Sequence, residues 1–127
     1  MIEQIGGLFL YSNSPKELAE WYKKTFQLKY QFEMNDELFG LSMYYTSPES
    51  NQRYTVFSIA KAKDKLSDNR EKTFTLNLRI SSMDDAQKHL SESGVELKGP
   101  EVHDEGKFAW VTDPDGNTIE LWEDTKT

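Results

Sequence analysis

The sequence predicts an α+β fold in which a βαβββ module occurs twice, at about residues 1–66 and 70–127. Two observations support this fold class. A segment of alternating residues precedes a capped amphipathic helix near Ser14, and the same succession returns at Ser82. Each helix is then followed by three short segments of extended, β-rich sequence. Each module is therefore expected to form a sheet with one helix covering one face.

The first module begins with a strand at residues 8–11, where leucines alternate with aromatic residues. A helix follows, because residues 14–17 (SPKE) combine an N-cap serine, a proline at the first helical position and a capping-box glutamate. Three strands are then expected at residues 29–33, 39–45 and 53–60. The apolar helix residues recur every three or four positions and predict one buried face: Leu18, Trp21, Tyr22, Thr25 and Phe26.

The second module repeats this order. A strand is expected at residues 75–80, where Leu76, Leu78 and Ile80 alternate with polar residues. Ser82 is expected to cap a helix that stops at Gly94, with Met83, Ala86 and Leu90 on its apolar side. Three strands are expected at residues 95–97, 108–112 and 118–122.

Turns and charge mark the connections between these elements. Residues 113–117 (DPDGN) lie between two β-rich runs and contain proline and glycine, which favours a tight antiparallel turn. Residues 47–51 (SPESN) occupy the corresponding place in the first module. The charged, glycine-free residues 61–72 between the modules are expected to form a solvated linker or a short helix.

Composition limits the classes of function. The chain has no cysteine, which excludes disulfides, thiolate catalysis and cysteine-based zinc sites. No segment reaches the roughly 20 apolar residues of a membrane span, and we expect a soluble, cytoplasmic protein with no membrane partner. The net charge of −7 opposes nucleic-acid binding and suits a neutral or cationic small molecule.

Four segments resemble the vicinal oxygen chelate superfamily, which includes glyoxalase I, the bleomycin-resistance proteins and the extradiol dioxygenases. They are PKELAEWYKKTFQL at 15–28, SGVELKGPEV at 93–102, GKFAWVTDPDGN at 106–117 and DPDGNTIEL at 113–121. The resemblance covers nearly the whole chain. It implies a curved mixed sheet around one shared cavity, helices on the outer face, and assembly as a homodimer.

Metal-dependent members of that superfamily use four His or Glu ligands on the first and last strands of each module. The matching positions here are Gly7, a residue within 53–60, Thr75 and Glu120, of which Glu120 alone is a ligand type. No His, Asp, Glu or Cys occurs nearby at residues 6–11, 53–60 or 73–79. A lone carboxylate does not hold a catalytic divalent ion. We therefore expect no cofactor and disfavour a divalent metal.

Strand alternation assigns side chains to the cavity once Glu120 is taken to point into it. The expected ligand-binding residues are Phe9, Tyr11, Thr75, Asn77, Arg79, Glu120 and Trp122. Glu120 is interpreted as an ion-pair partner of Arg79, as a ligand contact, or as a catalytic base whose pKa is raised by burial. The facing of Phe108 and Trp110 stays open, as does a place for His103 at the cavity mouth; His89 is expected on the helix surface.

These observations favour a metal-free protein, similar to the bleomycin-resistance branch, that binds a cationic or aromatic small molecule in the cavity. A first alternative is a glyoxalase-like, metal-dependent lyase, isomerase or dioxygenase whose ligands do not align with the family positions. A second alternative is a module for dimerisation or for interaction with another protein.

Overall fold

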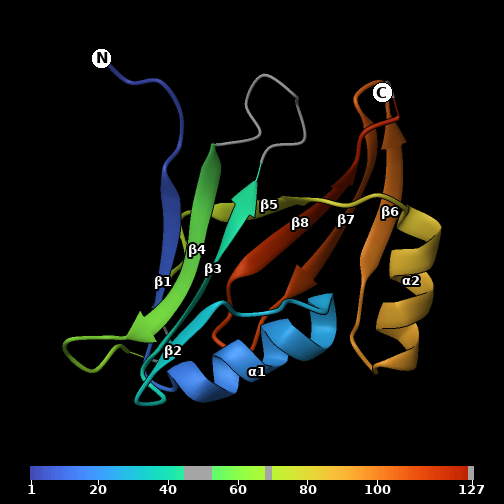
Figure 1. Ribbon diagram of the computed structural model, residues 1–127. Helices are drawn as coiled ribbons and strands as arrows, with labels where there is room; N and C mark the ends of the chain where they lie inside the picture. The colour runs from blue at the N-terminus through green and yellow to red at the C-terminus, as the bar shows by residue number, and fades with distance from the viewer. Residues whose placement is uncertain (45–52, 68–69, 126–127) are drawn as a thin grey trace. The chain divides into compact units, whose positions relative to one another are not determined.

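The computed structural model describes residues 1–44, 53–67 and 70–125. The chain forms two compact units, Met1–Ser67 (unit 1) and Asp68–Thr127 (unit 2). In each unit a strand and a helix are followed by three strands (Figure 1). The α+β class and the two βαβββ modules predicted from the sequence are confirmed.

Unit 1 has a four-stranded mixed sheet in the order β1-β4-β3-β2. Strands β1 and β4 are parallel, and the other neighbours are antiparallel. The elements are β1 (Gly7–Ser12), α1 (Pro15–Phe26), β2 (Phe32–Met34), β3 (Leu38–Tyr44) and β4 (Tyr54–Lys61).

Unit 2 repeats this topology in the order β5-β8-β7-β6, with β5 and β8 parallel and the other neighbours antiparallel. The repeated topology gives β1 and β5, and β4 and β8, equivalent places. The elements are β5 (Thr75–Arg79), α2 (Met83–Glu92), β6 (Lys98–His103), β7 (Gly106–Thr112) and β8 (Thr118–Glu123).

The core of unit 1 lies between α1 and one face of its sheet. Leu18 and Tyr22 of the predicted helical stripe are buried, and the Tyr22 ring lies 5.4 Å from the ring of Phe57 on β4. Ile59, two residues along on the same face, is also buried. The opposite face, which holds Ser58 between these two residues, is the open face of the unit 1 sheet.

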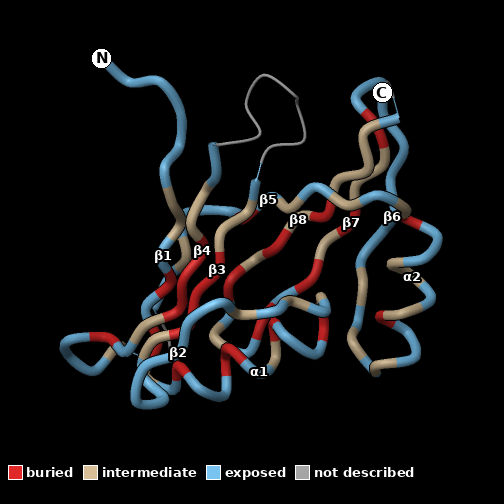
Figure 2. Tube along the Cα trace, viewed as in Figure 1, coloured by how far each residue is buried: buried red, intermediate tan, exposed pale blue. Residues whose placement is uncertain are grey.

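In unit 2 the core lies between α2 and the face of β8 that carries Ile119 and Leu121, both buried. Burial alternates along this strand, as predicted (Figure 2). Met83 and Leu90 are the buried residues of α2. The opposite face, which carries Glu120, is the open face of the unit 2 sheet.

The segment that follows α1 is fixed by Tyr30. Its hydroxyl donates a hydrogen bond to the carbonyl oxygen of Ala19, 2.9 Å away, and its ring lies 5.7 Å from that of Phe39. Burial, with a smaller contribution from the negative charge of Glu33, raises the pKa of the Tyr30 phenol. Tyr30 therefore acts as a neutral anchor between α1 and β3.

Two local predictions need correction. The Ser14 side chain does not cap α1; the Ser14 backbone N–H instead donates to Ser12 Oγ at 3.0 Å. The third-last strand is not at residues 95–97 but at β6, Lys98–His103. Gly99 and Pro100 interrupt its alternation and all its residues are exposed, so its sequence lacks the usual strand pattern.

The predicted turn at residues 113–117 is confirmed, and Asp113 organises it. Asp113 Oδ1 accepts hydrogen bonds from the backbone N–H groups of Asp115 and Asn117, and Oδ2 accepts one from Asn117 Nδ2. The predicted turn at residues 47–51 lies outside the described residues. Within the described ranges, no helix is long and apolar enough to cross a membrane.

The start of α2 is capped twice. Ser82 Oγ accepts from the Asp85 N–H at 3.1 Å, as predicted, and Glu123 Oε1 on β8 accepts from the Met83 N–H at 2.6 Å. A carboxylate there satisfies an N–H that has no partner within the helix and interacts favourably with the helix dipole. Glu123 thus ties α2 to the sheet.

Replacing Glu123 by alanine should lower the free energy of unfolding by about 1 to 2 kcal/mol, because the Met83 N–H loses its acceptor. Urea denaturation followed by circular dichroism measures this change. Glu123→Gln is the matched control and should recover part of the loss, since its amide oxygen still accepts. An alanine variant as stable as the original chain would contradict this account of the cap.

Candidate functional site

The candidate site is a row of three side chains across the open face of the unit 2 sheet. On the parallel pair of strands Asn77 lies opposite Glu120, and on the antiparallel pair Trp110 lies opposite Glu120. Directly paired residues project from the same face of a sheet. Asn77, Glu120 and Trp110 therefore form one row from β5 through β8 to β7, here called the Glu120 row.

The two neighbours of Glu120 hold its carboxylate from opposite sides. Asn77 Nδ2 donates to Oε1 at 2.8 Å, and Trp110 Nε1 donates to Oε2 at 2.9 Å. An indole N–H can only donate, and a carboxylate oxygen can accept more than one hydrogen bond. Glu120 is only partly buried, so its oxygens can still accept from a molecule placed on the face.

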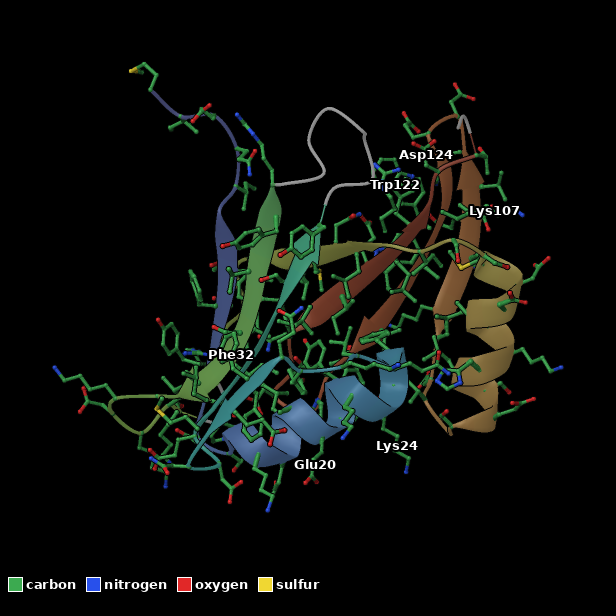
Figure 3. The ribbon with its side chains drawn as sticks, in the orientation of Figure 1. Glu20, Lys24, Phe32, Lys107, Trp122 and Asp124 are labelled. Carbon is green, nitrogen blue, oxygen red and sulfur yellow. The ribbon has the colours of Figure 1, made fainter. Side chains whose placement is uncertain are left out.

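The expected pair of Glu120 with Arg79 is not formed. Arg79 Nη1 instead donates to Asp124 Oδ2 at 3.0 Å, and its guanidinium lies 4.2 Å from the ring centroid of Trp122. The reason is strand register: Arg79 lies opposite Trp122, whereas Glu120 lies opposite Asn77. Figure 3 shows Trp122 and Asp124 at the end of β8.

A second row, here called the Trp122 row, consists of Arg79, Trp122 and Phe108. The rings of Trp122 and Phe108 are stacked, with centroids 6.0 Å apart and planes 4° apart. Trp122 Nε1 donates to the Glu105 carbonyl oxygen at 2.9 Å, which fixes the indole. Arginine over the face of an aromatic ring is a favourable cation–π arrangement. The open face thus combines a carboxylate, a guanidinium and three aromatic rings.

The facing of Phe108 and Trp110, left open by the sequence, is now defined. Both lie on the open face, because they pair with Trp122 and Glu120 in the antiparallel ladder. Their contribution to the site was missed because alternation along β7 shows that the two residues share a face but not whether that face packs against the helix. The available signal was the small aliphatic pair Ala109 and Val111, which alternates with them and is buried.

The two histidines lie apart from the Glu120 row. His103 ends β6, is exposed, and places Nε2 3.2 Å from Glu101 Oε2. Its ring centroid is 5.9 Å from that of Phe108, so it extends the Trp122 row toward the sheet edge. His89 lies on α2 and is partly buried.

The remaining predicted ligand contacts fall on the open faces of the two sheets. Phe9 and Tyr11 are more than half exposed on the face of the unit 1 sheet that is turned away from α1. Thr75 is exposed and pairs with Thr118 next to the Glu120 row.

The internal repeat allows a test of whether the family's metal could be held. Phe9 and Asn77 each stand six residues before the first residue of the following helix, so they are equivalent. Their strand partners, Ser58 and Glu120, are then equivalent too. The first candidate ligand set is thus Phe9, Ser58, Asn77 and Glu120. A shift of two residues along β1 and β5 replaces Phe9 and Asn77 by Gly7 and Thr75. In both sets Glu120 is the single carboxylate.

The donor chemistry does not fit a divalent cation at these positions. Outside residues 45–52, 68–69 and 126–127, no group of three or more His, Cys, Asp or Glu side chains could hold a metal ion. Each oxygen of Glu120 accepts from an N–H donor of Asn77 or Trp110, and those N–H groups would face any cation bound there.

A family model for the glyoxalase/bleomycin resistance protein/dioxygenase superfamily matches residues 4–121. The chain belongs to this superfamily. A search of curated proteins gives no match. Because the superfamily contains both enzymes and binding proteins, membership alone does not choose between these functions for the present member.

Several solved protein structures share the fold of this chain. One is a lactoylglutathione lyase from Agrobacterium tumefaciens, at 11% identity and a TM-score of 0.68, with 96% of this chain and 94% of that chain covered. Another is TnmS3, an antibiotic binding protein from Streptomyces sp. CB03234, at 20% identity and a TM-score of 0.67, with 98% of each chain covered. A possible glyoxalase from Bacillus cereus has 19% identity and a TM-score of 0.65, with 95% and 99% covered. At these identities the likeness concerns the fold.

Proposed function

We propose that this superfamily member binds a small aromatic molecule carrying an N–H donor or a cationic amine, without a metal, on the open face of unit 2. The observation that carries the proposal is the Glu120 carboxylate, held by Asn77 Nδ2 and Trp110 Nε1 on an aromatic face. A carboxylate oriented in this way offers a preorganised acceptor to a ligand donor.

The surroundings of Glu120 favour a planar, positively charged ligand. Trp110 belongs to the Glu120 row, and the stacked pair of Trp122 and Phe108 stands beside it. The Arg79 guanidinium over Trp122 is held in an ion pair with Asp124. Aromatic rings attract cations through their faces and pack against flat ligands. The net charge of −7 for the whole chain attracts cations and repels anions over longer distances.

The comparisons support a binding role by analogy. TnmS3 has the same fold and is described as an antibiotic binding protein. The metal-dependent lyase, isomerase or dioxygenase alternative requires a ligand set that the family positions of this chain do not supply. Cytoplasmic localisation and a homodimer belong to the same proposal and are tested by fractionation and by analytical ultracentrifugation.

Fluorescence titration with 9-aminoacridine, a planar cationic probe with N–H donors, tests this proposal. Glu120→Gln should weaken binding about tenfold, because the charge is lost and one amide side presents N–H to the donors of Asn77 or Trp110. Glu92→Gln is the matched control, since it removes an exposed carboxylate of unit 2 from α2, which packs on the opposite face of the sheet. It should leave the affinity within about twofold.

Two outcomes would overturn the proposal. One is an equal affinity of 9-aminoacridine for the original chain and for Glu120→Gln, with both proteins folded by circular dichroism. The other is a stoichiometric divalent metal in the purified protein whose removal by EDTA lowers the melting temperature.

A further inference from the structure

Arg79 stands between two carboxylates on the open face of unit 2. It lies opposite Trp122 in the parallel ladder, and the Ile80 N–H donates to the Trp122 carbonyl oxygen at 2.9 Å, which continues the ladder past it. Glu120 and Asp124 flank this point, two residues before and two residues after Trp122. Diagonal neighbours on adjacent strands lie within reach of a long side chain. The strand register therefore offers the guanidinium two carboxylate partners.

The guanidinium takes the partner at the end of β8. Arg79 Nη1 donates to Asp124 Oδ2 at 3.0 Å, while the guanidinium lies 4.2 Å from the ring centroid of Trp122. The Asp124 side chain is 17% exposed and that of Arg79 is 58% exposed, so the carboxylate is the shielded member of the pair. The pair directs the guanidinium toward the end of β8, where Figure 3 labels Trp122 and Asp124, and away from Glu120.

Glu120 is the natural acceptor for a guanidinium released from this pair. It is the one carboxylate on the open face of β8, where its neighbours are Thr118 and Trp122. Its two oxygens each accept a hydrogen bond, from Asn77 and Trp110, and a carboxylate oxygen can accept more than one. Arginine makes strong, charge-assisted bonds to such oxygens. A guanidinium bound there would fill the acceptor positions that a ligand donor needs and would neutralise the charge that attracts a cation.

We propose that Asp124 is a positioning residue, which holds Arg79 over Trp122 and thereby keeps the Glu120 carboxylate open to ligand. The inference rests on the function proposed above. The pair of Arg79 with Glu120 that the sequence suggested is then the closed state of the site, and Asp124 prevents it. Because Asp124 acts through Arg79, it should become dispensable once Arg79 is removed.

Asp124→Asn tests the inference in the full chain with two fluorescent probes. 9-Aminoacridine is cationic, whereas 2-aminonaphthalene is an uncharged N–H donor at neutral pH. Asp124→Asn should weaken the binding of both probes roughly fivefold, because Arg79 then occupies Glu120. Loss of one negative charge without this rearrangement would weaken the binding of the cationic probe alone. The uncharged probe thus separates occupation of Glu120 from a general change in charge.

The double variant Asp124→Asn/Arg79→Met is the matched comparison. Methionine keeps an unbranched side chain beside Trp122 but has no hydrogen-bond donor, so Glu120 should be open again. Both affinities should return to within about twofold of those of the original chain. Such recovery distinguishes positioning through Arg79 from structural damage, which a second substitution would not repair. Circular dichroism checks that each variant is folded.

A readout without ligand separates this inference from the proposed function. In the ¹⁵N-labelled chain, the indole N–H signal of Trp110 reports on its bond to Glu120 Oε2. The signal should move in Asp124→Asn and return in the double variant. If neither probe binds the original chain, the proposed function fails, and the Trp110 signal decides whether Asp124 holds Arg79 away from Glu120.

Four results would overturn the inference. They are unchanged affinities in Asp124→Asn, a weakening confined to 9-aminoacridine, a weakening that the double variant does not relieve, and a Trp110 indole signal that Asp124→Asn leaves in place.

Discussion

Replacing Asp113 by alanine should lower the free energy of unfolding by about 3 kcal/mol. Asp113 is 4% exposed, and its carboxylate accepts three hydrogen bonds at 2.8 to 2.9 Å within the turn between β7 and β8. Alanine would leave the backbone N–H and the side-chain amide of Asn117 without their acceptor, and Asn117 is itself buried. Unsatisfied buried donors are among the costliest consequences of a single substitution.

Denaturation in urea, followed by circular dichroism, measures this loss. Asp115→Ala is the matched control in the same turn, because only the backbone N–H of Asp115 takes part in the network. It should change stability by less than about 0.5 kcal/mol. The network account would be wrong if Asp113→Ala and Asp115→Ala had the same stability.

Replacing Gly106 by alanine should lower the free energy of unfolding by about 3 kcal/mol and displace the indole of Trp122. Gly106 has φ of 137°, a conformation that side chains rarely adopt. A methyl group there would overlap the carbonyl oxygen of Glu123 and stand 2.9 Å from Trp122 Nε1. The bond from Trp122 Nε1 to the Glu105 carbonyl should therefore break.

The displacement can be followed by the NMR signal of the Trp122 indole N–H, which should move or broaden in the variant. Gly94→Ala is a suitable control, since Gly94 also has a positive φ, of 74°, but no atom lies within 4 Å of an added methyl group. It should cost about 1 kcal/mol from backbone conformation alone. Equal losses for the two variants would show that the close approach at Gly106 is unimportant.

The fold was predictable because each element carries its own local signal. The alternation in β1, β5 and β8, the Ser82 cap and the turn at residues 113–117 are each readable over a few residues. The strand β6 was misplaced because Gly99 and Pro100 remove that alternation. Ser14 was misassigned as a cap because its sequence context permits a bond that the backbone does not make.

The site was less predictable because its contacts depend on strand register. The sequence identified Glu120 and Arg79 on one face. It did not show that Arg79 lies opposite Trp122, two residues along β8 from Glu120. Register also brings Trp110 to the carboxylate, from a strand whose facing was ambiguous.

The irregular strand β6 has a consequence for how the molecule avoids unwanted association. It forms one rim of the unit 2 sheet, where Pro100 lacks a backbone N–H and the pairing shifts between Lys98 and Glu101. An incoming strand would meet an interrupted series of donors and acceptors and could not continue the sheet on this side.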